Sequence, residues 1–355
     1  MAILSYVNIV IYLLLFLVSC ARSPLKNIEE AMRVASNPPT IEDSFLTQEF
    51  LVSLASHIEN MKTSAKVTDP MILGPIKISK EKYIASLEEI LKHEGDLIPW
   101  INTYFTLYEV YGYEHWGEVL TTGYYEPQVK GALEESALYS QPLYSLPIDL
   151  TIPYFERKEI DVDKKLEGRN LELAWVNPID AFFIQIQGTG LVEFPNGEVK
   201  RFGYAGKNGQ PYVPIGKFLT DVIPLDQMSM QKIRTHLESL SPNELQDIFN
   251  KNPSYVFFKI LEGGALTSAG MEVVQERTIA TDMEFFPKGA LAFLDIEDPI
   301  SHERKPRLVF DQDTGGAIKG GGRIDLYYGS GEEAARQAGI MKKIGRLYYL
   351  VPKTP

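Results

Sequence analysis

The chain has 355 residues, of which 45% are hydrophobic and 11% aromatic, and its formal net charge at pH 7 is −12. This length allows a substantial core and about two domains. The acidic balance argues against nucleic-acid binding, which requires a basic surface that replaces counterions. The 19 tyrosines and three tryptophans suit a protein that handles flat, polar-rimmed ligands, although ordinary core and surface aromatics explain them equally well.

The N-terminus has the pattern of an export signal. Residues 1–19, MAILSYVNIVIYLLLFLVS, carry no charged side chain and include a short apolar run that ends at Cys20. A membrane-spanning helix needs about 20 apolar residues, so the shorter run favours a signal sequence. The final letters LVSC resemble a bacterial lipobox, and Cys20 is the only cysteine, which excludes a disulfide framework. We predict a lipoprotein signal peptide over 1–19, lipid attachment at Cys20 and a polar tether over 20–39; an uncleaved N-terminal anchor is the alternative.

Three helices are predicted next along the chain. Apolar residues recur at three- and four-residue spacing from Phe45 to Met61 and define one apolar face. A second helix is predicted from an N-cap at Ser79 to a stop near Gly95. A third is predicted over 98–111, with a proline tolerated in its first turn. We expect these helices to serve packing.

From residue 118 the pattern changes to short apolar runs separated by Gly, Pro and Asn, which predicts strands. These runs are GEVLTTGYYEP, LELAWVNP, DAFFIQIQGTG, LVEFPNGEVKRFGYAG and QPYVPIGKF. Asn196-Gly197 lies between two alternating segments and predicts a hairpin turn. Two helices follow over 229–240 and 244–250, and the second begins with a capping-box pattern at Ser241.

The C-terminal third alternates strands with one helix. Strands are predicted over residues 255–260, 290–295, 307–310, 323–328 and 346–351, and a helix over 332–343. Between them lies the run VFDQDTGGAIKGGGRIDLYYGSG, residues 309–331, which combines many glycines with three aspartates. Glycine clusters indicate tight turns or a backbone that another group approaches closely. The predicted fold class is therefore mostly β with peripheral helices.

Several functions of this glycine-rich run can be set aside from its spacing. Phosphate binding requires Gly-x-x-x-x-Gly-Lys-Ser/Thr, which is absent. The five histidines are scattered and no cysteine pair exists, so we predict no metal and no cofactor; a carboxylate-only Mg²⁺ or Ca²⁺ site near Asp311 and Asp313 is the weaker alternative. Asp313-Thr314-Gly315 matches an aspartic protease tripeptide, but that chemistry needs two such carboxylates and the chain has one.

Glycan cleavage fits the run better. It needs a carboxylic acid that protonates a leaving oxygen, in a groove that admits sugar rings. Asp325 lies in a predicted strand between Ile324 and Leu326, which should face the core. The carboxyl of Asp325 should then emerge on the other face, beside the glycines, partly desolvated and with a raised pKa. This is what a general acid requires. The alternative is a strand aspartate that only accepts hydrogen bonds from turn amides.

The run that begins DTGGAIKGGGRIDLYYG and ends RLYYLVP resembles the closing module of the membrane-bound lytic murein transglycosylase A family, the 3D domain. The resemblance continues in TTGYYEP (121–127), in residues 182–219 and in NPSYVFFK (252–259). These segments occur in the family's order and span most of residues 118–351.

The resemblance implies a double-psi β-barrel main domain, formed by residues 40–127 and 251–355, with a smaller β-barrel-like domain inserted over 128–250. A glycan groove should lie between the two. The implied enzyme cuts the β-1,4 bond between N-acetylmuramic acid and N-acetylglucosamine in peptidoglycan and leaves a 1,6-anhydromuramyl product. A catalytically silent peptidoglycan-binding lipoprotein is the alternative. The implied location is the periplasmic face of the outer membrane, with cell-wall synthesis or divisome proteins as partners besides the glycan and the membrane.

The resemblance also assigns roles to single residues. It places the family's three aspartates at Asp295, Asp313 and Asp325, with Asp325 as the one catalytic group, first acid and then base, and Asp313 beside it as a second catalytic residue that tunes it. The glycine run should leave room for the sugar. Asp311 matches no family position and is expected to tolerate alanine. The residues expected to bind substrate are Thr122, Gly123, Tyr124, Gln187, Gly188 and Asp295.

Overall fold

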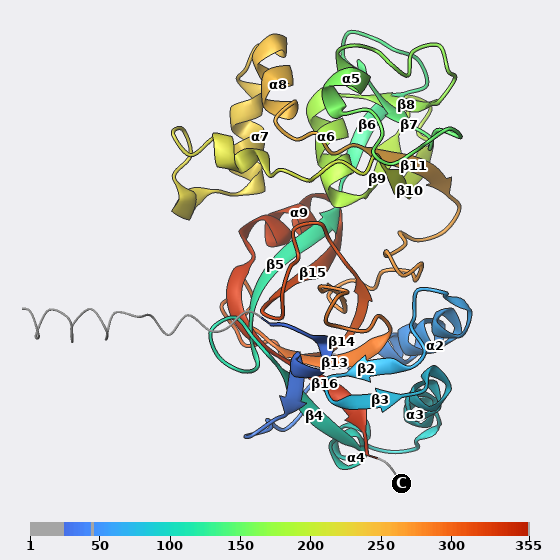
Figure 1. The fold of residues 1–355 in the computed structure, drawn as a ribbon, viewed down its shortest axis with the longest axis vertical. Coiled ribbons are helices and arrows are strands. Elements are labelled where there is room, and N and C mark those ends of the chain that lie inside the picture. The colour runs from blue at the N-terminus through green and yellow to red at the C-terminus, as the bar shows by residue number, and fades with distance from the viewer. Residues whose placement is uncertain (1–24, 44–45, 354–355) are drawn as a thin grey trace, which may run out of the picture.

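The computed structural model describes residues 25–43 and 46–353. The predicted signal peptide and Cys20 lie outside these residues. The described chain forms two lobes, one above the other in Figure 1. The lower lobe holds an eight-stranded sheet and the upper lobe a six-stranded sheet, so the mostly β prediction is confirmed.

The sheet of the lower lobe closes on itself. Its strands follow the order β1-β4-β16-β13-β14-β12-β15-β5, and β16 also pairs with β5. The six strands from β16 to β5 therefore form a barrel, from which β4 and β1 extend. The pairs β5–β15 and β12–β14 are parallel. The strands are β1 (Met32–Val34), β4 (Phe105–Val110), β5 (Glu118–Glu126), β12 (Thr278–Ala280), β13 (Ala290–Asp295), β14 (Arg307–Asp313), β15 (Arg323–Ser330) and β16 (Lys342–Pro352).

Helices cover this barrel, as their apolar faces predict. In α3, Tyr83 is fully buried, donates to the carbonyl oxygen of Leu350 at 3.1 Å and accepts from the amide of Leu291 at 2.9 Å. It thus joins α3 to two barrel strands. The remaining elements of this lobe are η1 (Ile28–Glu30), α2 (Gln48–Thr63), β2 (Met71–Leu73), β3 (Ile76–Ile78), α3 (Lys80–Lys92), α4 (Leu97–Tyr104) and α9 (Gly331–Ile340).

The upper lobe has its own sheet, with the order β11-β10-β9-β6-β8-β7. The predicted hairpin at Asn196-Gly197 is confirmed, because β9 and β10 pair antiparallel around it. Its elements are β6 (Gln128–Ala132), β7 (Gln141–Tyr144), α5 (Arg157–Asp161), β8 (Glu172–Val176), α6 (Pro178–Gln187), β9 (Thr189–Glu193), β10 (Val199–Lys207), η2 (Ile215–Phe218), η3 (Leu225–Gln227), α7 (Met230–Glu238), α8 (Pro242–Phe249) and β11 (Val256–Leu261).

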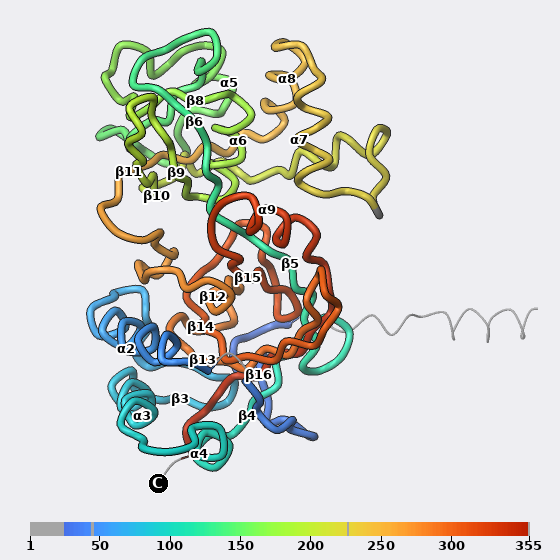
Figure 2. The backbone as a smooth tube through the Cα atoms, turned by 180° about the vertical axis from the view of Figure 1, so that it is seen from behind, coloured from blue at the N-terminus to red at the C-terminus, as the bar shows by residue number. Residues whose placement is uncertain are grey.

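The chain crosses between the lobes twice, once after β5 and once after β11 (Figure 2). A partly buried ion pair ties the crossings together. Glu126, at the end of β5, is 1% exposed and accepts from Nε of Arg201 at 2.9 Å and from the hydroxyl of Thr189 at 2.9 Å. Arg201 also donates to the carbonyl oxygen of Gly263, beyond β11, at 2.6 Å. The two lobes are therefore joined by a polar cluster as well as by the chain.

Two element predictions were wrong because tertiary pairing or end caps decided them. The helix predicted over 98–111 ends at Tyr104, because residues 105–110 form β4 and pair with β1 and β16. The run DAFFIQIQ forms α6 rather than a strand. Its N-cap Asn177 accepts from the amide of Ile179, a proline occupies the first turn, and Gly188 adopts a left-handed conformation (φ 78°) after the last turn.

Two further segments differ from their predicted form. QPYVPIGKF forms one short 3₁₀ helix, η2, rather than a strand. The segment predicted as a tether contributes β1, in which Met32 is 2% exposed and pairs opposite Val110. A tether therefore cannot extend as far as residue 39.

Candidate active site

Four neighbouring barrel strands bring two acids and a hydroxyl into one row. In the register, Asp325 of β15 lies opposite Thr122 of β5 on one side and Ala280 of β12 on the other. Ala280 in turn lies opposite Asp313 of β14. The row thus runs Asp313, Ala280, Asp325, Thr122. Residues 122 and 325 become neighbours only because the barrel brings β5 and β15 side by side.

Asp325 is partly buried and has one side-chain partner, the hydroxyl of Thr122, which donates to Oδ1. Burial raises its pKa to about 6; the charge of Asp313 adds to this rise, and the guanidinium of Arg323 opposes it. A carboxyl with this pKa carries its proton in about half of the molecules at pH 6 and in about a tenth of them at pH 7. The arrangement is suited to donating a proton and taking one back.

The carboxylate of Asp313 accepts more hydrogen bonds than that of Asp325. Its Oδ1 accepts from the amides of Ser268 at 2.8 Å and Thr314 at 2.9 Å, and its Oδ2 accepts from the hydroxyl of Tyr124 at 3.1 Å. Burial raises the pKa of Asp313, while these hydrogen bonds act in the opposite direction. Desolvation and the nearby Asp313 raise the pKa of Tyr124 well above its ordinary value, so the tyrosine stays a donor. Asp313 is therefore anchored, whereas one carboxylate oxygen of Asp325 has no donor in the part of the chain that the structure describes.

The glycine run is shaped mainly by protein contacts, which corrects its expected purpose. A Cβ at Gly322 would lie 2.5 Å from backbone atoms of Tyr113, and one at Gly321 would lie 3.2 Å from Cβ of Tyr111. These glycines let the loop before β15 pack against the turn between β4 and β5. Gly316 is exposed and lies on the side of Tyr212. Only part of the run is thus open to a ligand.

Asp282 is a site residue that the sequence reasoning missed. It is 1% exposed, and its Oδ2 accepts from the amide of Gly320 at 2.8 Å. This hydrogen bond holds the glycine run in place. The other carboxylate oxygen of Asp282 accepts from the amide of Glu284 at 3.2 Å. The available signal was an acid two residues after the short apolar run that forms β12 (Thr278–Ala280), where turn amides need an acceptor.

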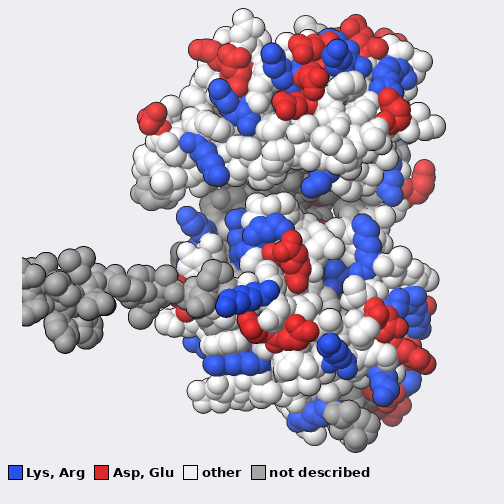
Figure 3. All heavy atoms as spheres, in the orientation of Figure 1, with Lys and Arg blue, Asp and Glu red and all other residues white. Residues whose placement is uncertain are grey.

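The upper lobe contributes residues opposite the row, and the molecular surface is hollowed between the lobes (Figure 3). Tyr212 lies close enough that the pKa of its hydroxyl, raised mainly by burial, is lowered by Arg323 and raised by Asp325. Gln187, at the end of α6, accepts from the amide of Tyr125 at 3.2 Å. Gly188 faces open space. The sequence reasoning selected Gln187 and Gly188 but missed Tyr212.

Two predicted substrate-binding residues lie elsewhere. Asp295 forms a bidentate ion pair with Arg304, at 2.7 and 2.9 Å, at the end of β13 away from the row. That end is roughly 16 Å along the strand from Ala290, which lies opposite Asp311, two residues before Asp313. The side-chain position of Gly123 points toward α9 and away from the row, because a Cβ there would lie 2.7 Å from Cα of Ala338. It permits helix packing rather than lining the groove.

Asp311 was expected to be dispensable, and the structure contradicts this. It is fully buried and accepts from Nζ of Lys288 at 2.7 Å, from the hydroxyl of Thr281 at 2.7 Å and from the hydroxyl of Tyr349. Lys288 is itself 4% exposed. Asp311 therefore neutralises a buried cation inside the barrel.

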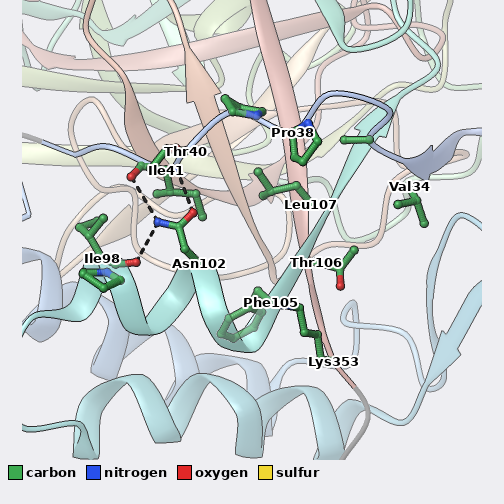
Figure 4. A pocket seen from close by; sticks show the side chains of 13 residues that line it. Val34, Pro38, Thr40, Ile41, Ile98, Asn102, Phe105, Thr106, Leu107 and Lys353 are labelled. Carbon is green, nitrogen blue, oxygen red and sulfur yellow. Dashed lines mark hydrogen bonds between the residues drawn. The ribbon is translucent and has the colours of Figure 1, made fainter.

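Other features of the described chain do not add to the site. Within residues 25–43 and 46–353 no three His, Cys, Asp or Glu side chains gather where they could hold a metal ion. A pocket of about 500 Å³ lies between α4 and β4, lined by none of the predicted site residues (Figure 4). The side-chain amide of Asn102, which lines this pocket, already accepts from the backbone amide of Ile41 and donates to the carbonyl oxygen of Ile98. Among the helices in the described part of the chain, none has the length and apolarity to span a membrane.

Two family models match most of the barrel and of the upper lobe. Residues 120–259 match the model of the MltA specific insert domain, and residues 277–351 match the 3D domain. The chain is 33% identical over 245 residues to membrane-bound lytic murein transglycosylase A of Vibrio cholerae, covering 66% of each chain. It is 32% identical over 276 residues to the Escherichia coli protein of the same name, covering 75% of this chain and 74% of that relative.

Solved structures show the same fold. A membrane-bound lytic murein transglycosylase from Agrobacterium tumefaciens superposes with a TM-score of 0.75 and 25% identity, covering 86% of this chain and 92% of that one. Escherichia coli MltA with bound chitohexaose gives a TM-score of 0.73 and 26% identity, covering 93% of this chain and 96% of that one. The chain therefore belongs to the membrane-bound lytic murein transglycosylase A family and is a peptidoglycan-cleaving lyase.

Proposed function

We propose that the enzyme cleaves the β-1,4 bond between N-acetylmuramic acid and N-acetylglucosamine, with Asp325 as its single acid and base. The observation that carries this proposal is the contrast between the two acids of the row. Asp325 has a pKa of about 6 and one oxygen that no described residue donates to, whereas Asp313 is held by three donors. Asp325 can therefore exchange a proton with a ligand more easily than its neighbour.

The reaction then needs one carboxyl and no water. Asp325 gives its proton to the glycosidic oxygen, and the bond from that oxygen to C1 of the muramyl residue breaks, so that N-acetylglucosamine leaves as an alcohol. The C6 hydroxyl of the same muramyl residue bonds to C1, and its proton passes to the Asp325 carboxylate. The product is a 1,6-anhydromuramyl end, and the acid is restored. A two-carboxylate scheme is required only where water is the nucleophile or the glycosyl group is transferred to the enzyme.

Neighbouring residues support this role by position. Thr122 donates to Oδ1 of Asp325 and so orients the carboxyl, while Oδ2 has no donor among the described residues. Asp313, fixed by Tyr124 and two amides, raises the pKa of Asp325 through its charge and needs no contact with the reacting atoms. Tyr124, with Gln187, Gly188 and Tyr212 on the upper lobe, forms the groove that takes the glycan strand.

The finer architecture and location follow the family resemblance. We propose that the closed six-stranded barrel has double-psi topology, as its two parallel pairs among antiparallel neighbours suggest, and that the upper lobe is the inserted domain. We also propose a lipid at Cys20 that holds the protein at the periplasmic face of the outer membrane. The relatives are named membrane-bound, and residues 1–20 have the sequence pattern of such a signal. Cell-wall synthesis or divisome proteins would be its partners there.

Digestion of purified murein sacculi tests the chemistry. Residues 21–355 would be incubated with sacculi. The soluble fragments would be separated by chromatography, and their masses determined by mass spectrometry. We expect anhydromuramyl ends from the wild type, none from Asp325→Asn, and wild-type amounts from Asp247→Asn, an exposed acid in α8. Reducing muramic acid ends would show that water is the nucleophile. Sacculus binding without any cleavage would favour the silent binding protein.

A further inference from the structure

Arg323 is a partly buried cation whose donors are mostly unused. It lies on β15 two residues before Asp325, so the two side chains share one face of the strand. Its one hydrogen bond is long, from Nη2 to the hydroxyl of Thr122 at 3.5 Å. Its Nε is buried and has no partner among the described residues, and none of the described carboxylates forms an ion pair with it.

An unpaired buried donor is costly. A buried polar group without a hydrogen bond loses roughly 1–3 kcal/mol, and more if it is charged. Other arginines of this protein are matched: Arg201 bonds both oxygens of Glu126 and Arg304 both oxygens of Asp295. The guanidinium of Arg323 offers five donors in a planar fork, and the structure uses one of them weakly. Such a group is prepared for acceptor oxygens that come from a ligand.

Its position shows which part of a ligand it would meet. Arg323 shares a strand face with Asp325 and donates to Thr122 of the row, and its charge also lowers the pKa of the Tyr212 hydroxyl in the upper lobe. Alternate side chains on one strand face are roughly 6.6–7 Å apart. A sugar whose C1 lies at Asp325 would therefore place its C3 substituent, two carbons along the ring, within reach of Arg323.

That substituent distinguishes the two sugars of peptidoglycan. Muramic acid is glucosamine with a lactyl ether at O3, and the lactyl carboxyl group is the added acceptor. Guanidinium groups bind carboxylates through two parallel hydrogen bonds. On the basis of the proposed reaction, we propose that Arg323 binds the lactyl carboxyl oxygens of the muramyl residue at Asp325 and so selects that sugar at the cleaved position.

The proposal distinguishes two forms of the substrate. In strands stripped of stem peptides the lactyl group is a free carboxylate, which accepts two charge-assisted bonds from Arg323. In strands that carry stem peptides it is an amide, whose carbonyl oxygen is uncharged and weaker. The enzyme should therefore bind peptide-free strands more tightly. Pairing with a carboxylate would also weaken the effect by which the free guanidinium lowers the pKa of Asp325, and so keep the acid protonated.

The test measures binding without turnover. In an Asp325→Asn background, affinities would be measured by calorimetry for peptide-free GlcNAc–MurNAc strands, for the same strands with stem peptides, and for chitohexaose, which has no lactyl group. We expect the peptide-free strands to bind about tenfold more tightly than chitohexaose, as one charge-assisted contact supplies. Strands with stem peptides should fall between the two. Added Arg323→Gln should remove the difference and leave chitohexaose affinity within about twofold, and Arg323→Lys should keep part of it.

Controls separate this proposal from folding and from the reaction itself. Arg336→Gln, on the exposed face of α9, should leave all three affinities unchanged. Circular dichroism melting would show whether the Arg323 variants fold, and Arg323→Met offers a similar volume if the glutamine variant does not. Equal affinity of the Asp325→Asn protein for peptide-free strands and chitohexaose would overturn the proposal, as would an equal loss for both ligands in Arg323→Gln. A failure of the proposed reaction would instead appear in the sacculus digest and would leave these affinities as they are.

Discussion

The buried pair of Asp311 and Lys288 allows a prediction that opposes the sequence-based expectation for Asp311. The carboxylate is fully buried, and its side-chain donors come from three residues: Lys288, Thr281 and Tyr349. Asp311→Ala would leave the ammonium group of Lys288 buried without its counter-charge and two hydroxyl groups without an acceptor. The substitution should therefore destabilise the barrel strongly, although Asp311 does not contact the proposed groove.

The size of the effect follows from the burial. Removal of one partner of a buried ion pair costs about 3–5 kcal/mol, because the remaining charge is uncompensated. Native domains have a free energy of unfolding of about 5–15 kcal/mol, so this loss is a third or more of the total in most cases. Replacing both members with apolar residues of similar volume, Asp311→Leu with Lys288→Met, should recover most of it, because no buried charge remains.

Urea unfolding measures the effect. Trp175 lies in β8 of the upper lobe, so a Trp175→Phe background lets tryptophan fluorescence report the lower lobe alone. We expect the free energy of unfolding to fall by about 3–5 kcal/mol in Asp311→Ala and by less than about 0.5 kcal/mol in Asp247→Ala, an exposed control. A loss under about 1 kcal/mol in Asp311→Ala would refute the reasoning, as would a double variant less stable than Asp311→Ala.

Four other predictions concern the site and the anchor. Because Asp325 must be protonated to start the reaction and its pKa is about 6, kcat/KM for sacculi should fall about tenfold per pH unit above that value; a flat profile from pH 5 to 8 would exclude this acid. Asp325→Ala should lower turnover by about 10²–10⁴-fold, whereas Asp313→Asn should cause a smaller, graded loss, and equal losses would contradict the separate roles. Gly123→Ala should destabilise the protein by about 1–3 kcal/mol in thermal melts, because the new Cβ would meet the backbone of Ala338; an unchanged melting temperature would show that α9 moves freely. Cys20→Ser should stop incorporation of a labelled fatty acid and leave an uncleaved precursor, and labelling that persists would place the lipid elsewhere.

Local features of the sequence determined several elements and the catalytic candidate. Ile324 and Leu326 are each 1% exposed while Asp325 between them is only partly buried, as alternation along a strand predicts. The hairpin at Asn196-Gly197 and the capping box at Ser241 formed as predicted, because both depend on residues a few positions apart. Asp325 could be proposed as the acid from its immediate neighbours alone.

The meaning of the aspartates on β14 depended on an irregularity that alternation cannot reveal. The register between β12 and β14 shifts so that Ile279 lies opposite Asp311 and the next residue, Ala280, opposite Asp313. One extra residue, Gln312, therefore lies between two acids that would otherwise share a face. Asp311 enters the barrel and Asp313 reaches the row. Two aspartates that are two positions apart therefore have different roles: Asp311 balances a buried charge, and Asp313 lies in the row.

The site as a whole was decided by contacts between distant parts of the chain. Thr122 meets Asp325 across 203 positions because β5 and β15 pair in the closed barrel. Tyr212 comes near Gly316 and the charge of Asp325 because the upper lobe lies against the lower one. The sequence by itself indicated most strands of the C-terminal third, the hairpin turn at Asn196-Gly197 and the acid that core residues flank, since neighbouring residues set those properties. Only the tertiary structure decided which acids share the site, that Asp295 lies away from it and that Nε of Arg323 has no hydrogen-bond partner among the described residues. Strand register, barrel closure and burial are set by residues far apart in sequence.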